Sequence, residues 1–224
     1  PDGRLVFAAG LKGVEALDAE TGRPLFQLDR GLTMVGAIAA SPDGATVAAC
    51  GQGTEVVTWD VPSRRVRREF RCDPYQVVRV AFTCDGVLLL AVGWQGTLVA
   101  WEAGTGREVV RLESPTGTAP GRAMGPFYPC LAASPVDAGL VATRGADGSI
   151  LVWDLKRSVG LFRFDPGHGG VSRMAFTADG VALAAISADG SLRLWDLGDG
   201  RELAREEVGS SWGGGLVECD DGRR

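Results

Sequence analysis

The chain has 224 residues, of which 45% are hydrophobic and 23% are charged, and its formal net charge is −5. This length and apolar content suffice for a sizeable hydrophobic core and exclude a disordered chain. An acidic chain without a stripe of interleaved basic and aromatic residues is a poor partner for nucleic acid or anionic lipid. No apolar run approaches the roughly 20 residues that cross a bilayer. We therefore predict a globular protein that binds neither nucleic acid nor membrane.

The cysteines show neither a CxxC spacing nor a pairing with histidines, and their number is odd. We interpret them as reduced thiols that pack as small apolar residues, and we predict no metal site and no cofactor. The five are Cys50, Cys72, Cys84, Cys130 and Cys219.

Two lysines among many arginines, with no asparagine, indicate a GC-rich genome and hence a bacterial source. No signal peptide is visible, which together with reduced thiols favours the cytoplasm. Because the chain begins at Pro1 without an initiator methionine, we expect that it can be part of a larger multidomain protein.

A repeat runs through the whole chain. Five dipeptides recur at spacings of 42, 42, 52 and 42 residues, and Asp-Gly turns run in phase with them at 1–3, 41–44, 83–86, 177–180 and 218–221. Two markers with one period are strong evidence for repeated structural units. The dipeptides are Leu17-Asp18, Trp59-Asp60, Trp101-Glu102, Trp153-Asp154 and Trp195-Asp196.

Taken in chain order, the repeat units span approximately 1–40, 41–82, 83–134, 135–176 and 177–224. The clearest stretch, from Val171 to Arg201, reads VSRMAF, a TADG turn, VALAAIS, an ADG turn, SLRLWD and an LGDG turn before RELARE. Strand-length apolar runs bounded by Asp-Gly turns predict antiparallel hairpins, and no window has a long 3.6-residue apolar period. Each unit is therefore predicted to be a four-stranded antiparallel meander.

These features resemble the WD-repeat family, whose units of about 40 to 45 residues each build one blade of a β-propeller. The resemblance implies an all-β fold of about five four-stranded blades in a single domain, residues 1–224. The phase of the turns predicts that the chain starts on a second strand and stops after a first strand. Residues Trp212 to Asp221 can then pair with Arg4 to Gly10 and close a five-blade ring. The chain can equally be an arc of a larger propeller.

The resemblance also implies a buried structural network of a histidine, a hydroxyl, an aspartate and a tryptophan. The matching residues are His168, Ser187, Asp189 and Trp195, although the sequence leaves open which hydroxyl on the second strand takes part. A catalytic or metal-binding role for the one histidine is the alternative. Other units depart from the pattern, so we predict that Trp195→Phe lowers thermal stability more than Trp59→Phe.

One face of the predicted blades is rich in large side chains. In an antiparallel meander, the connections between blades and the turns between second and third strands lie at the same end. Aromatic residues and methionine are enriched at protein interfaces, whereas the alternative is that single members pack between blades or plug the channel. The insertion at 113–129 is expected to project from this face as a binding loop or a merely variable one. The candidate residues are Met34, Tyr75, Trp94, Phe127, Tyr128 and Trp212.

A basic cluster lies on one predicted outer strand. We favour the interpretation that these charges block the addition of another strand, with a site for an acidic partner as the alternative. The cluster consists of Arg64, Arg65, Arg67, Arg68 and Arg71.

The sequence thus predicts a non-enzymatic scaffold, or a regulatory or sensor module, that binds a protein or peptide. A propeller enzyme would need several histidine ligands, inward-facing acids or a nucleophile with its base, and the chain has one histidine. A propeller enzyme, or a propeller that binds a small ligand in its central channel, is the alternative.

Overall fold

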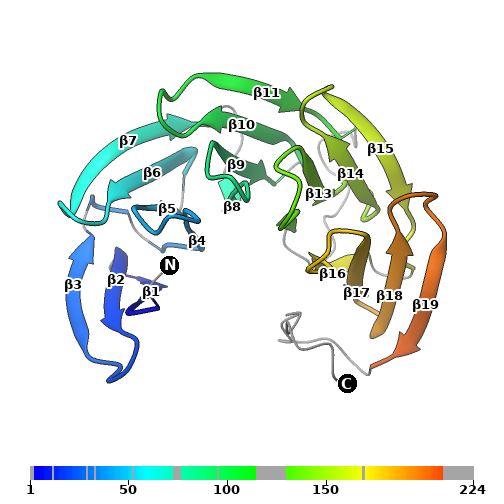
Figure 1. The fold of residues 1–224 in the computed structure, drawn as a ribbon, viewed down its shortest axis with the longest axis horizontal. Helices are drawn as coiled ribbons and strands as arrows, with labels where there is room; N and C mark the ends of the chain where they lie inside the picture. Colours follow the sequence, from blue (N-terminus) through cyan, green and yellow to red (C-terminus); the bar gives the residue numbers. More distant parts are fainter. Residues whose placement is uncertain are drawn as a thin grey trace. The chain divides into compact units, whose positions relative to one another are not determined.

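The computed structural model describes residues 3–11, 13–28, 30–32, 34–51, 53–72, 77–94, 96–114, 130–167 and 170–208. These residues form nineteen strands in five antiparallel sheets (Figure 1). None of them forms a helix that is long and apolar enough to span a membrane. The chain makes two compact units, residues 1–111 and 112–224.

The first unit contains three sheets, drawn from blue to green in Figure 1. The first sheet has the order β1-β2-β3, the second β4-β5-β6-β7, and the third β8-β9-β10-β11. The strands are β1 (Leu5–Gly10), β2 (Gly13–Asp18), β3 (Pro24–Leu28), β4 (Ala37–Ala40), β5 (Thr46–Cys50), β6 (Glu55–Asp60), β7 (Arg65–Arg71), β8 (Val77–Phe82), β9 (Leu88–Gly93), β10 (Leu98–Glu102) and β11 (Glu108–Leu112).

The second unit contains two four-stranded sheets with the orders β12-β13-β14-β15 and β16-β17-β18-β19. Each strand again pairs with its neighbour in sequence, so every sheet is a simple meander. The strands are β12 (Leu131–Ala133), β13 (Leu140–Arg144), β14 (Ile150–Asp154), β15 (Val159–Phe164), β16 (Val171–Phe176), β17 (Ala182–Ser187), β18 (Ser191–Asp196) and β19 (Glu202–Glu207).

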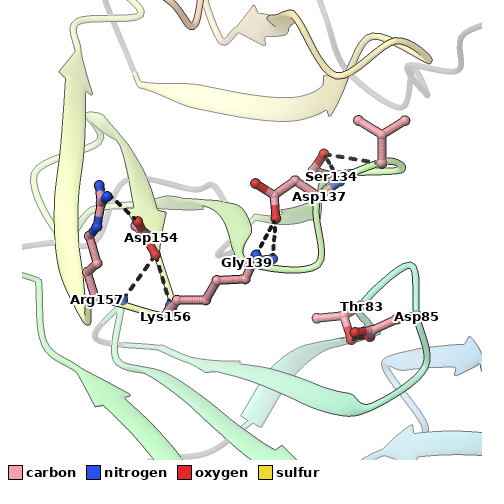
Figure 2. A network of polar contacts seen from close by, with 9 residues as sticks. Thr83, Asp85, Ser134, Asp137, Gly139, Asp154, Lys156 and Arg157 are labelled. Carbon is pink, nitrogen blue, oxygen red and sulfur yellow. Dashed lines mark hydrogen bonds and ion pairs between the residues drawn. The ribbon is translucent and has the colours of Figure 1, made fainter.

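Aspartates hold the turns in the conformation that the strands require. Asp179 accepts hydrogen bonds from the Thr177 hydroxyl at 2.6 Å and from the Val181 amide at 3.0 Å, while Gly180 has a φ of 71°. Only glycine adopts this left-handed conformation without a steric cost. Thr83 and Asp85 form the same pair at 2.6 Å (Figure 2). The Ser/Thr-x-Asp-Gly pattern therefore encodes the hairpin that joins the first and second strands of a blade.

Aspartates also close the turn between the third and fourth strands. Figure 2 shows Asp154, which accepts hydrogen bonds from the amides of Lys156 and Arg157 at 2.9 and 3.0 Å. The same view shows Asp137, in the turn between β12 and β13, which accepts hydrogen bonds from the Gly139 amide at 2.8 Å and from the Lys156 ammonium at 3.3 Å. These aspartates thus stabilise turns.

The core lies between neighbouring sheets of each unit. In the first unit, Phe70 on β7 packs against Trp101 on β10, with ring centroids 5.3 Å apart. In the second unit, Phe164 on β15 stacks on Trp195 of β18 at 5.1 Å. Phe70 and Phe164 occupy corresponding positions, because each pairs with the residue three places before the tryptophan of its own sheet. An apolar residue on the last strand of one sheet therefore covers the tryptophan of the next.

The predicted all-β fold of WD-type antiparallel blades is confirmed. Each four-stranded sheet takes its first strand from the end of the preceding repeat unit, and the first sheet consists of β1, β2 and β3, in agreement with a chain that enters on a second strand. The single domain and the choice between a closed ring and an arc stay predictions. The predicted closing segment, 212–221, lies outside the described residues.

Candidate protein-binding face

Hydrogen bonds place the connections between blades at the same end of the sheets as the turns between second and third strands. In the first unit, the Val35 amide donates to the Gly10 carbonyl at 3.3 Å, and the Val77 amide donates to the Gly53 carbonyl at 3.1 Å. In the second unit, the Val171 amide donates to Gly148 at 3.3 Å. Each connection is thus tied to the turn of the preceding blade, as the meander topology requires. We call this end of each unit the candidate face.

Met34 lies on the candidate face directly before Val35, and its side chain is 51% exposed. Its φ is 50°, a left-handed conformation that costs a residue with a side chain roughly 1 to 2 kcal/mol. Leu11, beside the Gly10 carbonyl that Val35 contacts, is 75% exposed. Leu11 is not among the residues predicted from the sequence, although it is an apolar residue directly after Gly10 at the end of a predicted strand.

The other candidate residues are described in part. Trp94 follows β9 at the turn to β10 and is half-buried, so its ring is not a freely exposed anchor. Four candidates lie outside the described residues, together with most of the insertion at 113–129. They are Tyr75, Phe127, Tyr128 and Trp212.

Of the four residues of the predicted network, Ser187, Asp189 and Trp195 are described, whereas His168 lies outside the described residues, so the network stays a prediction. Asp189 accepts hydrogen bonds from the Ser191 hydroxyl and amide at 2.7 and 2.9 Å, and the fully buried Ser187 hydroxyl donates to the Pro166 carbonyl. Trp195 itself pairs across the sheet with Leu183, four residues before Ser187. Ser187 therefore ties the second strand to the connection between blades.

A second tryptophan shows which hydroxyl position meets an indole. Trp153 on β14 donates from Nε1 to the hydroxyl of Thr143 on β13 at 2.8 Å. Thr143 lies two residues beyond Val141, the cross-strand partner of Trp153. The corresponding residue in the sheet of Trp195 is Ala185, which has no acceptor on its side chain. A hydroxyl that accepts a tryptophan N–H is thus present in the Trp153 blade, whereas the corresponding position of the Trp195 blade is an alanine.

Trp59 is the contrasting case. Its Nε1 atom is buried and finds no acceptor among the residues that the structure describes. Its cross-strand partner is Val47, so the position that corresponds to Thr143 is Ala49, which is fully buried. A buried indole N–H without an acceptor has lost its hydrogen bond to water and gains none from the protein, which lowers the stability of the fold.

Comparison with known proteins agrees with this architecture. Residues 160–196, which run from β15 to the end of β18, match the family model of the WD domain, G-beta repeat. The chain contains a WD repeat. No curated protein matches its sequence.

A polar cavity of about 400 Å³ opens on the candidate face of the second unit of this WD-repeat chain. It is lined by the ion pair of Asp147 and Arg163, by Asp165 and by two close glycines, Gly148 and Gly170. Burial by itself raises the pKa of Asp147, but hydrogen bonds from Ser149 and Arg163 outweigh it, so the pKa is lowered overall. The carboxylate therefore stays charged and paired at neutral pH.

The thiols of the WD-repeat chain are mostly buried. Cys50, Cys72 and Cys130 are buried, Cys84 is half-buried, and none of these four described cysteines forms a disulfide. Burial raises the pKa of Cys50 to about 12, which keeps this thiol protonated and unreactive at neutral pH. Cys219 lies outside the described residues.

The basic cluster on β7 contacts the neighbouring sheets of the first unit. The Arg64 guanidinium stacks on the Phe26 ring of β3 at 4.3 Å, and Arg68 donates to the Gly104 carbonyl after β10 at 2.9 Å. Arg67 donates to the Thr46 hydroxyl at 2.8 Å within its own sheet. Part of the cluster thus fastens adjacent blades, a role that neither sequence interpretation included. Blocking of strand addition and an acidic partner stay predictions.

Proposed function

We propose that this WD-repeat protein is a non-enzymatic interaction module that binds a protein or peptide through the candidate face. Met34 carries the proposal, because it is an exposed apolar residue held in a left-handed conformation. Backbone strain that the surrounding structure maintains is characteristic of functional sites. A scaffold or a regulatory or sensor part of a larger cytoplasmic protein fits this role. The remaining members of the proposed surface are Tyr75, Trp94, Phe127, Tyr128 and Trp212.

The repeat itself supplies the comparison for Met34. Gly170 stands directly before Val171, as Met34 stands directly before Val35, and its φ is 77°. The backbone of this connection therefore takes a left-handed residue in both blades, and glycine takes it without a side-chain clash. A methionine at such a position is not explained by the stability of the connection. A thioether side chain that adapts to an apolar partner is a physical reason to keep it there.

Leu11 enlarges the proposed contact. Its exposed side chain and that of Met34 stem from two backbone segments joined by the hydrogen bond between Val35 and Gly10. Apolar groups on a backbone that hydrogen bonds already hold lose less conformational entropy when they bind. Two such anchors on adjacent segments are suited to an apolar ridge of a partner, such as one face of a helix or a loop with a large apolar residue.

The test separates binding from stability. Proteins captured from a lysate of the source organism by the wild type are compared, by quantitative mass spectrometry, with those captured by Leu11→Ser/Met34→Gly. We expect this variant to lose the specific partner at least about tenfold, because two central apolar anchors are removed. We expect the melting temperature to be unchanged or raised, because glycine relieves the left-handed strain.

The matched control is Val87→Ser. Val87 is exposed to 54%, similar to Met34, but lies in the turn between β8 and β9, at the opposite end of the same unit. It should leave capture unchanged. Equal capture by wild type and Leu11→Ser/Met34→Gly would refute the proposed face, and loss of capture by Val87→Ser alone would move the contact to the other end.

A further inference from the structure

The two methionines among the described residues differ sharply in exposure. Met34 on the candidate face is 51% exposed, whereas Met174 on β16 is 9% exposed and packs in the apolar cluster of the second unit. The third methionine of the chain, Met124, lies outside the described residues. Peroxides oxidise thioethers to sulfoxides, and exposed side chains react first. Met34 is therefore accessible to a dissolved oxidant, whereas the fold protects Met174.

The surroundings of Met34 suit a thioether and not a polar group. Leu11, on the segment joined to it by the hydrogen bond between Val35 and Gly10, is 75% exposed and apolar. The amide that follows Met34 in the chain, that of Val35, already donates to the Gly10 carbonyl at 3.3 Å. This amide is therefore not available to an oxygen atom added at the sulfur.

We propose that Met34 is a modification site at which a peroxide switches off partner binding. This inference rests on the proposed function, because Met34 is one of its two apolar anchors. The sulfur attacks one oxygen of hydrogen peroxide, the O–O bond breaks, and the other oxygen leaves as water with both protons. The sulfur is thereby oxidised by two electrons to a sulfoxide, and the peroxide is reduced. Methionine sulfoxide reductases reverse the change.

Oxidation changes the polarity of the contact and leaves the fold intact. Water hydrates the sulfoxide oxygen as long as the side chain of Met34 is exposed. An apolar partner removes this water without supplying a hydrogen-bond donor, and burying an unpaired polar group is unfavourable. We therefore expect oxidation of Met34 to weaken capture of the partner about tenfold, as the loss of a central anchor does, with an unchanged melting temperature.

Peptide mass spectrometry after graded exposure to hydrogen peroxide tests the site without any partner. The exposed fractions of 51% and 9% predict that Met34 of the native chain is oxidised at least about fivefold faster than Met174. In concentrated urea the two rates should become similar, because the protection of Met174 comes from the fold. Equal rates in the native chain would overturn the assignment of the site.

The capture assay of the proposed function tests the switch. The wild type is treated with peroxide, freed of it and then exposed to the lysate, and capture should fall about tenfold and return after treatment with sulfoxide reductases. The matched control is Met34→Leu, which keeps an apolar side chain together with Met124, Met174 and every cysteine. Its capture, whatever its own level, should be the same before and after peroxide.

Failure of the switch and failure of the proposed function give different results. Equal capture by wild type and Leu11→Ser/Met34→Gly refutes the face, and the switch with it. If that variant loses the partner but oxidation of Met34 leaves capture unchanged, the face stands and the switch is overturned. An equal loss in Met34→Leu after peroxide also overturns the switch, because another methionine or a thiol is then responsible. So does a lowered melting temperature of the oxidised wild type, because unfolding then explains the loss.

Discussion

The hydrogen bond between Trp153 and Thr143 offers a sharp test of how single side chains stabilise a blade. Thr143 is fully buried, and its hydroxyl accepts the indole N–H at 2.8 Å. Thr143→Val keeps the shape of the side chain and removes the acceptor. The buried N–H then loses its partner, which costs about 1 to 3 kcal/mol. We expect a loss of this size in the free energy of unfolding.

A double-mutant cycle isolates the bond. In a Trp153→Phe background the N–H is absent, so Thr143→Val should cost much less there, and the coupling free energy should be about 1 kcal/mol or more. Urea denaturation followed by circular dichroism supplies the four free energies. A coupling below about 0.5 kcal/mol would show that the bond contributes nothing measurable and would refute the reasoning.

The same reasoning predicts a gain at Trp59. Ala49→Ser places a hydroxyl where Trp59 has no acceptor among the described residues, and it should stabilise the first unit by up to about 1 kcal/mol. The increase should vanish in a Trp59→Phe background. Destabilisation in both backgrounds would indicate that the fully buried site cannot accommodate the extra oxygen.

Three further predictions concern the packing, the backbone and the turns. Phe164→Ala removes the ring that stacks on Trp195 and should lower the free energy of unfolding by about 3 to 5 kcal/mol in urea titrations. Gly170→Ala should lower the melting temperature more than Gly22→Ala, because both have a positive φ but only at Gly170 would the new Cβ lie 3.1 Å from the Gly148 backbone. The pKa of Asp179 lies below its ordinary value of 3.8, first because of the hydrogen bond from the Thr177 hydroxyl and then because of that from the Val181 amide. The carboxylate therefore contributes stability above its unfolded pKa, and this contribution is lost as the pH falls through the lower pKa of the folded state. Asp179→Asn should therefore reduce the acid sensitivity of the melting temperature between about pH 5 and pH 3, and an unchanged pH profile would contradict this assignment.

The strands and turns of this WD-repeat protein follow from local rules. A Ser/Thr-x-Asp-Gly turn satisfies its own hydroxyl and amide groups, as Thr177 and Asp179 do, so it forms wherever that pattern occurs. Alternation of such turns with short apolar runs leaves few folds other than successive antiparallel meanders. The sequence therefore predicted the blades and the strand on which the chain enters.

Which side chains form hydrogen bonds with each other could not be predicted from the local sequence. Thr143 accepts the hydrogen bond from Trp153 because the register places it two residues beyond Val141, the cross-strand partner of Trp153. Ser187 lies four residues beyond Leu183, the cross-strand partner of Trp195, and donates to the Pro166 carbonyl instead. The sequence shows both hydroxyls near a turn aspartate, and only the register distinguishes them.

The candidate face likewise has features that the sequence predicted and features that only the tertiary structure decided. The position of Met34 in the repeat was enough to predict that it lies on the candidate face, because the alternating direction of the strands determines which end of a blade each connection occupies. Its left-handed φ, the neighbouring exposure of Leu11 and the half-burial of Trp94 were decided by tertiary structure. Exposure and backbone strain depend on which segments cover a residue and tie its backbone. For Met34 and Leu11 those ties run between blades, through the hydrogen bond from Val35 to Gly10.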